Sequence, residues 1–174
     1  MPTRRLSGTA TAASEPDNGG DNSGGGSGTY VDDVFSTYLC EYTGSGDVTV
    51  ANGIDLAGEG GLVWWKNRTL DNGNGNHRLS DTERGVDKAL ITNSTLGEQG
   101  PSHTVSSFNA DGFVFNNGQG GTHDYVSWTF RKAPKFFDVV TYTGTDVARD
   151  IPHNLGVEPG MIIVKSSSLA LGWS

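Results

Sequence analysis

The chain has 174 residues, a formal net charge of −8 and a hydrophobic fraction of 34%, with 26 glycines. The acidic balance argues against a nucleic-acid binder, which needs a basic surface to displace phosphate counterions, and no apolar run approaches the ~18 residues of a membrane-spanning helix. The single cysteine, Cys40, excludes an intrachain disulfide.

Residues 1–30 form the first predicted segment, a Gly-rich arm. From Pro2 to Gly28 there are seven glycines and one sizeable apolar residue, Leu6. Such a composition buries too little apolar surface to offset the loss of chain entropy, so we expect an extended or disordered arm. Arg4 and Arg5 give it a basic tip, which is either a docking point for an acidic partner or two solvated charges.

Alternation with a period of two predicts strands in the part that follows. The alternating sets are Val48 with Val50, Phe113 with Phe115, and Val126 with Trp128 and Phe130, whose bulky side chains share one face. Residues 136–142 are mostly β-branched and aromatic, and also predict strand. Ala133-Pro134 predicts a corner between two strands, because proline donates no ladder hydrogen bond.

Two continuous apolar runs, Leu62–Trp65 and Met161–Val164, are typical of strands covered on both faces. They belong to an apparent internal repeat. Tyr42-Thr43-Gly44 recurs as Tyr142-Thr143-Gly144, and Gly61–Lys66 corresponds to Gly160–Lys165. We therefore expect a second copy of a module to begin near residue 135 and to be incomplete at Ser174. Long repeats are typical of structural and binding proteins.

The connections are rich in Gly, Asn and Asp, which favour tight turns. They include Asn52-Gly53, Asp71–Gly75, Asn109–Gly112 and Asn116–Gly121. Only Asp81–Leu90 suits a helix of one or two turns, with Asp81 as N-cap. The sequence thus predicts an all-β chain with three parts: the arm (1–30), a β-sandwich or jelly-roll-like domain (31–134) and the start of a second β module (135–174).

No pattern of catalytic or metal-binding residues stands out. Asp71–Asn76 has oxygen ligands for calcium, but glycines occupy two of the positions that an EF-hand loop uses, so a plain hairpin is the preferred interpretation. The four histidines lack zinc spacing, and no carboxylates are paired by the sequence. We therefore expect no enzyme, no metal and no cofactor.

Two side-chain groups are candidates for structural roles. The aromatic residues Trp64, Trp65, Trp128, Phe130, Phe136 and Phe137 suit core packing, with a sugar-stacking platform as the alternative. Trp64 and Trp65 must point to opposite faces of a strand, so one of them is a candidate interface residue. Asp81, placed between Arg78 and Arg84, suits an ionic network that fixes a long loop. Cys40 suits a small buried hydrophobe.

Four sequence blocks carry a resemblance to a known family. They are Trp64-x-Lys66-Asn67-Arg68, His77-Arg78-Leu79-x-Asp81-Thr82-x-Arg84-Gly85, Ser107-Phe108-Asn109-x-Asp111-Gly112-Phe113, and Tyr125–Gly144. These blocks resemble a domain of tail-fibre-like virion proteins of marine bacteriophages, notably phages of cyanobacteria. The resemblance covers Asp32 to Trp173, is most specific over residues 128–143, and leaves out the arm.

The resemblance implies a structural protein of the virion tail, with no catalytic residues to carry over. Such fibres are typically homotrimers, and their N-termini anchor to the tail. We therefore expect the arm to dock on a tail adaptor, nozzle or baseplate protein, with Arg4, Arg5 and Leu6 as contacts. Distal modules would then meet host surface glycans. Two alternatives remain open: a decoration fibre of the capsid or neck, and a carbohydrate-binding module in which Trp64 or Trp65 is exposed beside Asp or Asn.

Overall fold

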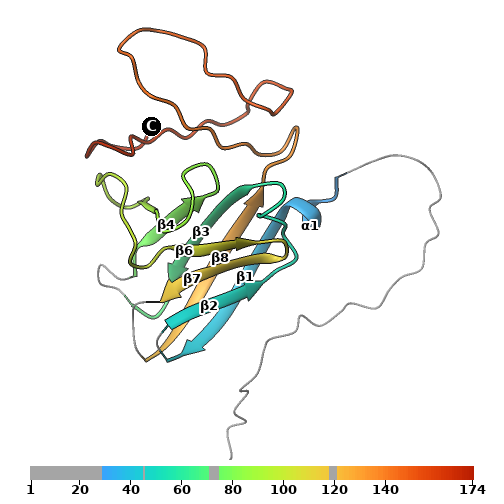
Figure 1. The fold of residues 1–174 in the computed structure, drawn as a ribbon, viewed down its shortest axis with the longest axis vertical. Coiled ribbons are helices and arrows are strands. Elements are labelled where there is room, and N and C mark those ends of the chain that lie inside the picture. The colour runs from blue at the N-terminus through green and yellow to red at the C-terminus, as the bar shows by residue number, and fades with distance from the viewer. Residues whose placement is uncertain (1–28, 45, 71–74, 118–120) are drawn as a thin grey trace, which may run out of the picture.

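The computed structural model describes residues 29–44, 46–70, 75–117 and 121–174 (Figure 1). The predicted arm lies almost entirely outside these residues, as does most of the predicted Asp71–Gly75 turn. The described part is all-β, as the sequence predicts, with one short helix, α1 (Val31–Val34). No helix in this part is long and apolar enough to cross a membrane.

Two antiparallel sheets build the domain (Figure 1). The strands are β1 (Phe35–Thr43), β2 (Gly46–Ala51), β3 (Gly61–Asn67), β4 (His77–Asp81), β5 (Leu90–Ile91), β6 (Val105–Asn109), β7 (Gly112–Asn117) and β8 (Thr122–Arg131). The five-stranded sheet has the order β1-β8-β3-β4-β5, and the three-stranded sheet the order β2-β7-β6. The two sheets face each other as a β-sandwich, which confirms the predicted fold class.

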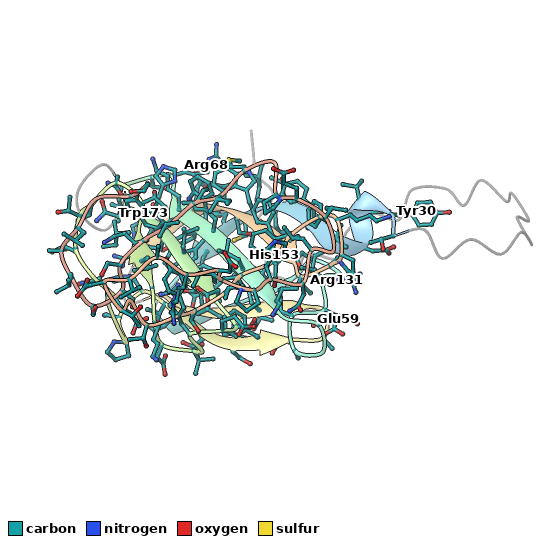
Figure 2. All side chains as sticks on the ribbon, turned by 90° about the horizontal axis from the view of Figure 1, so that it is seen from above. Tyr30, Glu59, Arg68, Arg131, His153 and Trp173 are labelled. Atoms are coloured by element: carbon teal, nitrogen blue, oxygen red, sulfur yellow. The ribbon has the colours of Figure 1, made fainter. Side chains whose placement is uncertain are left out.

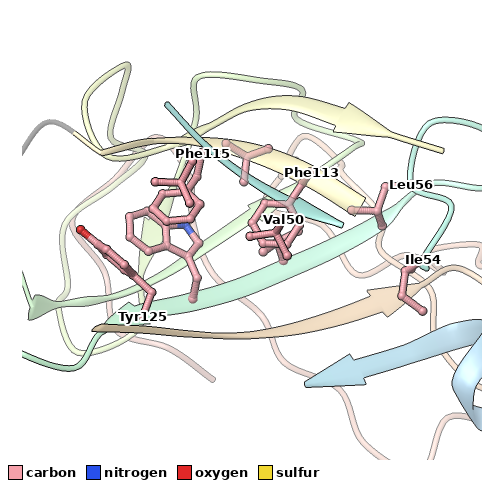
Figure 3. Close-up of a cluster of buried hydrophobic side chains, with 10 residues drawn as sticks. Val50, Ile54, Leu56, Phe113, Phe115 and Tyr125 are labelled. Atoms are coloured by element: carbon pink, nitrogen blue, oxygen red, sulfur yellow. The ribbon is translucent and has the colours of Figure 1, made fainter. Parts of the chain in front are cut away.

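The core lies between the sheets and is built from alternate residues of facing strands (Figure 3). Val50, Phe113 and Phe115 of the smaller sheet are at most 1% exposed, as their alternation predicts. Phe115 packs on Trp65 of β3 and on Tyr125 of β8, with ring centroids 4.8 and 5.0 Å apart. Burying large aromatic side chains in this way is the main stabilising term of a small sandwich.

The alternating set Val126, Trp128 and Phe130 of β8 shares one face, as predicted, but this face is the outer side of the sheet. Ser127 and Thr129 point inward and are buried, whereas Trp128 and Phe130 are half-buried outside. Small inward residues leave room for the large rings of the opposite sheet, and Thr129 Oγ1 accepts a 2.9 Å hydrogen bond from Asn52 Nδ2. The core packing expected of Trp128 and Phe130 is therefore replaced by packing on the outer face.

Among the described residues, the predicted turn at Asn109–Gly112 is confirmed. Asn109 pairs with Gly112 to close the β6–β7 hairpin, and a Cβ atom on Gly112 would collide with the Val50 carbonyl oxygen. The helix predicted over 81–90 is wrong. Its N-cap residue Asp81 does accept the Arg84 N–H at 2.9 Å, but Gly85 has φ of 90° and ends the turn at once.

Residues 135–174 contain no strand and lie across one end of the sandwich (Figure 1). β8 ends at Arg131, before the predicted corner at Ala133-Pro134. The strands predicted over 136–142 and 161–164 are wrong. Phe136 and Phe137 instead fold back on Phe130, with ring centroids 6.5 and 5.4 Å away. In the 161–164 run only Val164 pairs with another backbone segment: its N–H donates to the Ser174 carbonyl at 2.7 Å and its carbonyl accepts the Ser174 N–H at 3.0 Å. One such pair does not make a strand, which is stable only when its backbone pairs over several residues.

Candidate functional site

The residues predicted to contact a partner through the arm, Arg4, Arg5 and Leu6, lie outside the described residues. The described part therefore has to be searched on its own for a functional site. Its candidates are a buried ionic network, an aromatic group on the outer face of the larger sheet, a groove at one end of the sandwich, and the exposed C-terminal segment.

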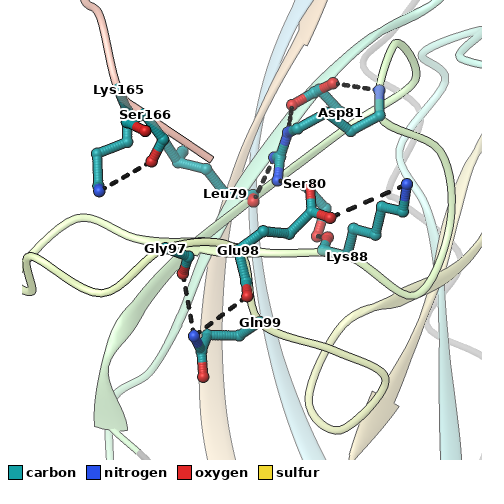
Figure 4. Close-up of polar contacts among 10 residues, drawn as sticks. Leu79, Ser80, Asp81, Lys88, Gly97, Glu98, Gln99, Lys165 and Ser166 are labelled. Carbon is teal, nitrogen blue, oxygen red and sulfur yellow. Dashed lines mark hydrogen bonds and ion pairs between the residues drawn. The ribbon is translucent and has the colours of Figure 1, made fainter. Parts of the chain in front are cut away.

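The ionic network centres on Arg84, whose contacts fix the loops around β4 (Figure 4). Arg84 Nε lies 2.6 Å from Asp81 Oδ2, and Nη1 lies 3.3 Å from Glu98 Oε2. Arg84 Nη2 also donates to the Leu79 carbonyl at 3.0 Å. The Arg84 and Asp81 side chains are only 9% and 4% exposed. This matches the predicted role of fixing a long loop, and it leaves little of the network accessible to a ligand.

The second arginine predicted to flank Asp81 lies elsewhere. Arg78 and Asp81 are three residues apart on β4, so their side chains point to opposite faces of the sheet. Arg78 points into the sandwich, where its guanidinium lies 5.9 Å from the Trp65 ring centroid in a cation–π contact. Burial lowers the pKa of Arg78 from its ordinary value. The prediction that Asp81 lies between two arginines is therefore wrong.

The titratable side chains of the described residues are spread over several elements. Among the described residues, no three His, Cys, Asp or Glu side chains come together as a candidate metal site. His77 lies on β4, His123 on β8, and His103 and His153 in connections. Cys40 lies on β1 and packs partly against the core, and burial raises the pKa of its thiol to about 11. This thiol is therefore a weak nucleophile at neutral pH.

Trp64, His77 and Trp128 form the aromatic group on the outer face of the larger sheet. Trp64 Nε1 donates a 3.0 Å hydrogen bond to His77 Nδ1, and the Trp64 and Trp128 rings meet edge to face at 5.6 Å. Burial, followed by the nearby Lys66 charge, lowers the pKa of His77 and keeps Nδ1 free to accept. The predicted opposite orientation of Trp64 and Trp65 is confirmed, with Trp65 2% exposed in the core and Trp64 half-buried outside.

An open groove of about 550 Å³ lies where the 56–60 loop meets the turn after β4 and the strand β6. Its lining includes Leu56, Glu59, Thr82, Glu83, Ser107 and Phe108. Each of its two carboxylates has a basic partner: Glu83 Oε1 lies 2.6 Å from Lys132 Nζ, and Glu59 Oε1 lies 3.9 Å from Arg131 Nη1. Both carboxylates that could act as a general acid or base in this groove are therefore already paired with a basic side chain.

Within the described part of the chain, the C-terminal segment (residues 135–174) presents four consecutive exposed apolar residues. Met161, Ile162, Ile163 and Val164 are 77%, 70%, 62% and 40% exposed. The segment is attached to the loop after β5 through hydrogen bonds from Lys165 Nζ to the Thr95 carbonyl and from Trp173 Nε1 to the Ile91 carbonyl. Figure 2 shows Trp173 on the side of the molecule opposite Tyr30, the residue before α1. Sequence reasoning found this run but predicted it to be buried.

The two facing antiparallel sheets define the class of the domain as an all-β sandwich. The chain belongs to the family described as a domain of unknown function (DUF7483), whose model matches residues 32–174. The match therefore includes the strandless C-terminal segment as well as the sandwich. No curated protein and no solved structure matches the chain.

Proposed function

We propose that the chain is a structural assembly module of a virion, the N-terminal region of a phage tail fibre. One observation carries the assembly part of this proposal: four consecutive apolar side chains, Met161–Val164, are exposed on an extended segment. Monomeric proteins rarely leave such a run in water, and its usual role is contact with another protein. The virion and tail parts of the proposal rest on the sequence blocks that resemble tail-fibre-like proteins.

In this proposal the module is a homotrimer without enzymatic activity. Its arm, through Arg4, Arg5 and Leu6, docks on an adaptor, nozzle or baseplate protein of the tail, and further modules meet the host. The alternative of a capsid or neck fibre has the same chemistry and a different location on the virion.

The test is binding of the full chain, and of the chain lacking residues 1–30, to tail-containing and to tail-depleted virion subassemblies. We expect only the full chain to bind, and only where tails are present. Binding to heads would move the protein to the capsid. Equal binding without the arm would contradict the role of Arg4, Arg5 and Leu6.

A second candidate function is glycan binding, favoured by the half-buried Trp64 and Trp128 on the outer face of the larger sheet. Aromatic rings beside polar groups are able to stack on sugars, and Lys66 and His77 lie next to them in the sheet. Titrating the chain with oligosaccharide from bacterial lipopolysaccharide, while following tryptophan fluorescence, tests this. A saturable change that the Trp128→Phe variant weakens would support glycan binding, and no change would reject it for this glycan.

A further inference from the structure

β1 has a free edge of unusual length. It is a nine-residue strand at the margin of the larger sheet, and among the described residues only β8 pairs with it. Proteins usually block such an edge with lysine, proline, a bulge or a covering loop. β1 contains no lysine and no proline, and its single charged residue is Glu41. No second described strand therefore pairs with the backbone groups along this edge, which can accept another strand.

The side chains of β1 are suited to an apolar neighbour on both faces. Leu39 points outward and is 62% exposed, whereas Tyr38 and Cys40 point inward and are partly buried against the core. A strand added at this edge would lie beside Leu39 on one face and beside Tyr38 and Cys40 on the other. Cross-strand pairs of this kind stabilise a sheet, so the centre of the edge, at Tyr38–Cys40, favours a neighbour that is apolar on both faces.

The 160–165 segment has this character. Its residues Met161–Val164 are apolar at four successive positions, and both of its faces are exposed. Three of the four are β-branched, which suits the pleated conformation of a strand. The segment thus has the composition of a buried strand. Among the described residues its backbone pairs only at its C-terminal end, where Val164 exchanges two hydrogen bonds with Ser174 and Lys165 lies opposite Trp173, so the rest of the segment is open to a further strand.

The two features lie at opposite sides of the same chain. Trp173 Nε1 bonds to the Ile91 carbonyl at the end of β5, while β1 is the far edge of the same sheet, with β8, β3 and β4 between them. Four strand spacings amount to about 19 Å. The segment therefore meets the β1 edge of another copy more readily than its own.

We propose that residues 160–165 of one copy add as a strand to the free edge of β1 in a second copy. The two surfaces are different, so the contact is head-to-tail, and each copy donates one strand and accepts another. Contacts of this type close into rings or continue as filaments, and a ring of three copies would be the trimer of the proposed function. The inference shares one assumption with the proposed function, namely that the chain associates with copies of itself.

The test measures the association of the full chain by sedimentation velocity over a concentration series. A donor variant carries Ile162→Lys and Ile163→Lys, and an acceptor variant carries Thr37→Lys and Leu39→Lys. A matched control carries Val147→Lys and Val157→Lys, at residues 74% and 44% exposed outside both surfaces. We expect the donor and acceptor variants each to weaken association by about 10-fold or to abolish it, and the control to associate as the unmodified chain does.

Mixing the two weakened variants gives the decisive result. The donor variant keeps an intact β1 edge, and the acceptor variant keeps an intact 160–165 segment, so a 1:1 mixture should form a heterodimer and no larger species. A mixture that remains monomeric would overturn the proposal, provided circular dichroism shows both variants folded. Association that survives in the donor variant would equally overturn it, in favour of a symmetric β1–β1 contact. Failure to bind virion tails would contradict the proposed function without changing these results.

Discussion

Arg84 carries a charge that is paired and almost fully removed from water. Its guanidinium lies 2.6 Å from the Asp81 carboxylate, and both side chains are almost fully buried. We predict that Arg84→Met lowers the free energy of unfolding by ~3–5 kcal/mol, because Asp81 is left as an uncompensated buried charge. Urea unfolding measures this. Lys88→Ala is the control, since Lys88 is 47% exposed and lies 3.9 Å from Glu98, and it should cost less than ~1 kcal/mol.

Cys40 shows how burial controls reactivity at a single residue. Its pKa is raised from an ordinary 9.0 to about 11, mainly by desolvation and then by the Asp124 charge. A pKa that is higher by about two units makes the thiolate fraction of the folded chain about 100-fold smaller than that of the unfolded chain at the same pH. Alkylation by iodoacetamide at pH 8 should therefore be at least about 100-fold slower in the folded chain than in urea. Similar rates in both states would show that Cys40 is not held in this environment.

At the scale of elements, β3 is the central strand of the larger sheet, and its two tryptophans separate the two faces. Trp65 is 2% exposed and contacts Phe115 and Tyr125. We predict that Trp65→Ala lowers the free energy of unfolding by ~3–5 kcal/mol through cavity formation. Trp64→Ala should cost clearly less, because Trp64 is half-buried on the outer face. A larger loss from Trp64→Ala in chemical denaturation would place the main core on the outer face instead.

The elements that the sequence could predict are those whose signal is local. Alternation located β2, β7 and β8, and the Asn109–Gly112 turn located a hairpin that the structure contains. The orientation of β8 was not predictable, because it depends on pairing with β1, a strand some 90 residues earlier in the chain. The inward positions Ser127 and Thr129 gave no signal, since small polar residues are equally common on exposed faces.

The candidate contact surface was predictable only in part. The apolar character of Met161–Val164 is plain in the sequence, and its exposure is not, because exposure depends on which strands lie beside it. The free edge of β1 is likewise a property of the sheet order, which local patterns do not contain. One contact of the ionic network was predictable, because Asp81 and Arg84 lie within one turn of the chain. The contact of Arg84 with Glu98 was not, because it depends on how the loop after β5 folds back towards β4.

At the scale of the whole molecule, the sandwich is complete in itself, and the C-terminal segment is not. The sandwich has a closed aromatic core between two sheets. The segment, by contrast, exposes a strand-like apolar run between its two attachments to the sandwich. These are Phe136 and Phe137 on Phe130, and the hydrogen bonds of Lys165 and Trp173 to the Thr95 and Ile91 carbonyls. Such a chain lowers its free energy by associating, because association removes the exposed run from water. This is the physical basis for the claim that the chain is an assembly module.

The mass of the unmodified chain in solution tests this claim most directly. Light scattering after size-exclusion chromatography, over a range of micromolar concentrations, should give the mass of three copies of the 18.4 kDa chain. A mass that falls towards a single copy on dilution would agree with a reversible contact of the same kind. A mass of one copy at every concentration would contradict the account, because the exposed Met161–Val164 run would then be stable in water without a partner.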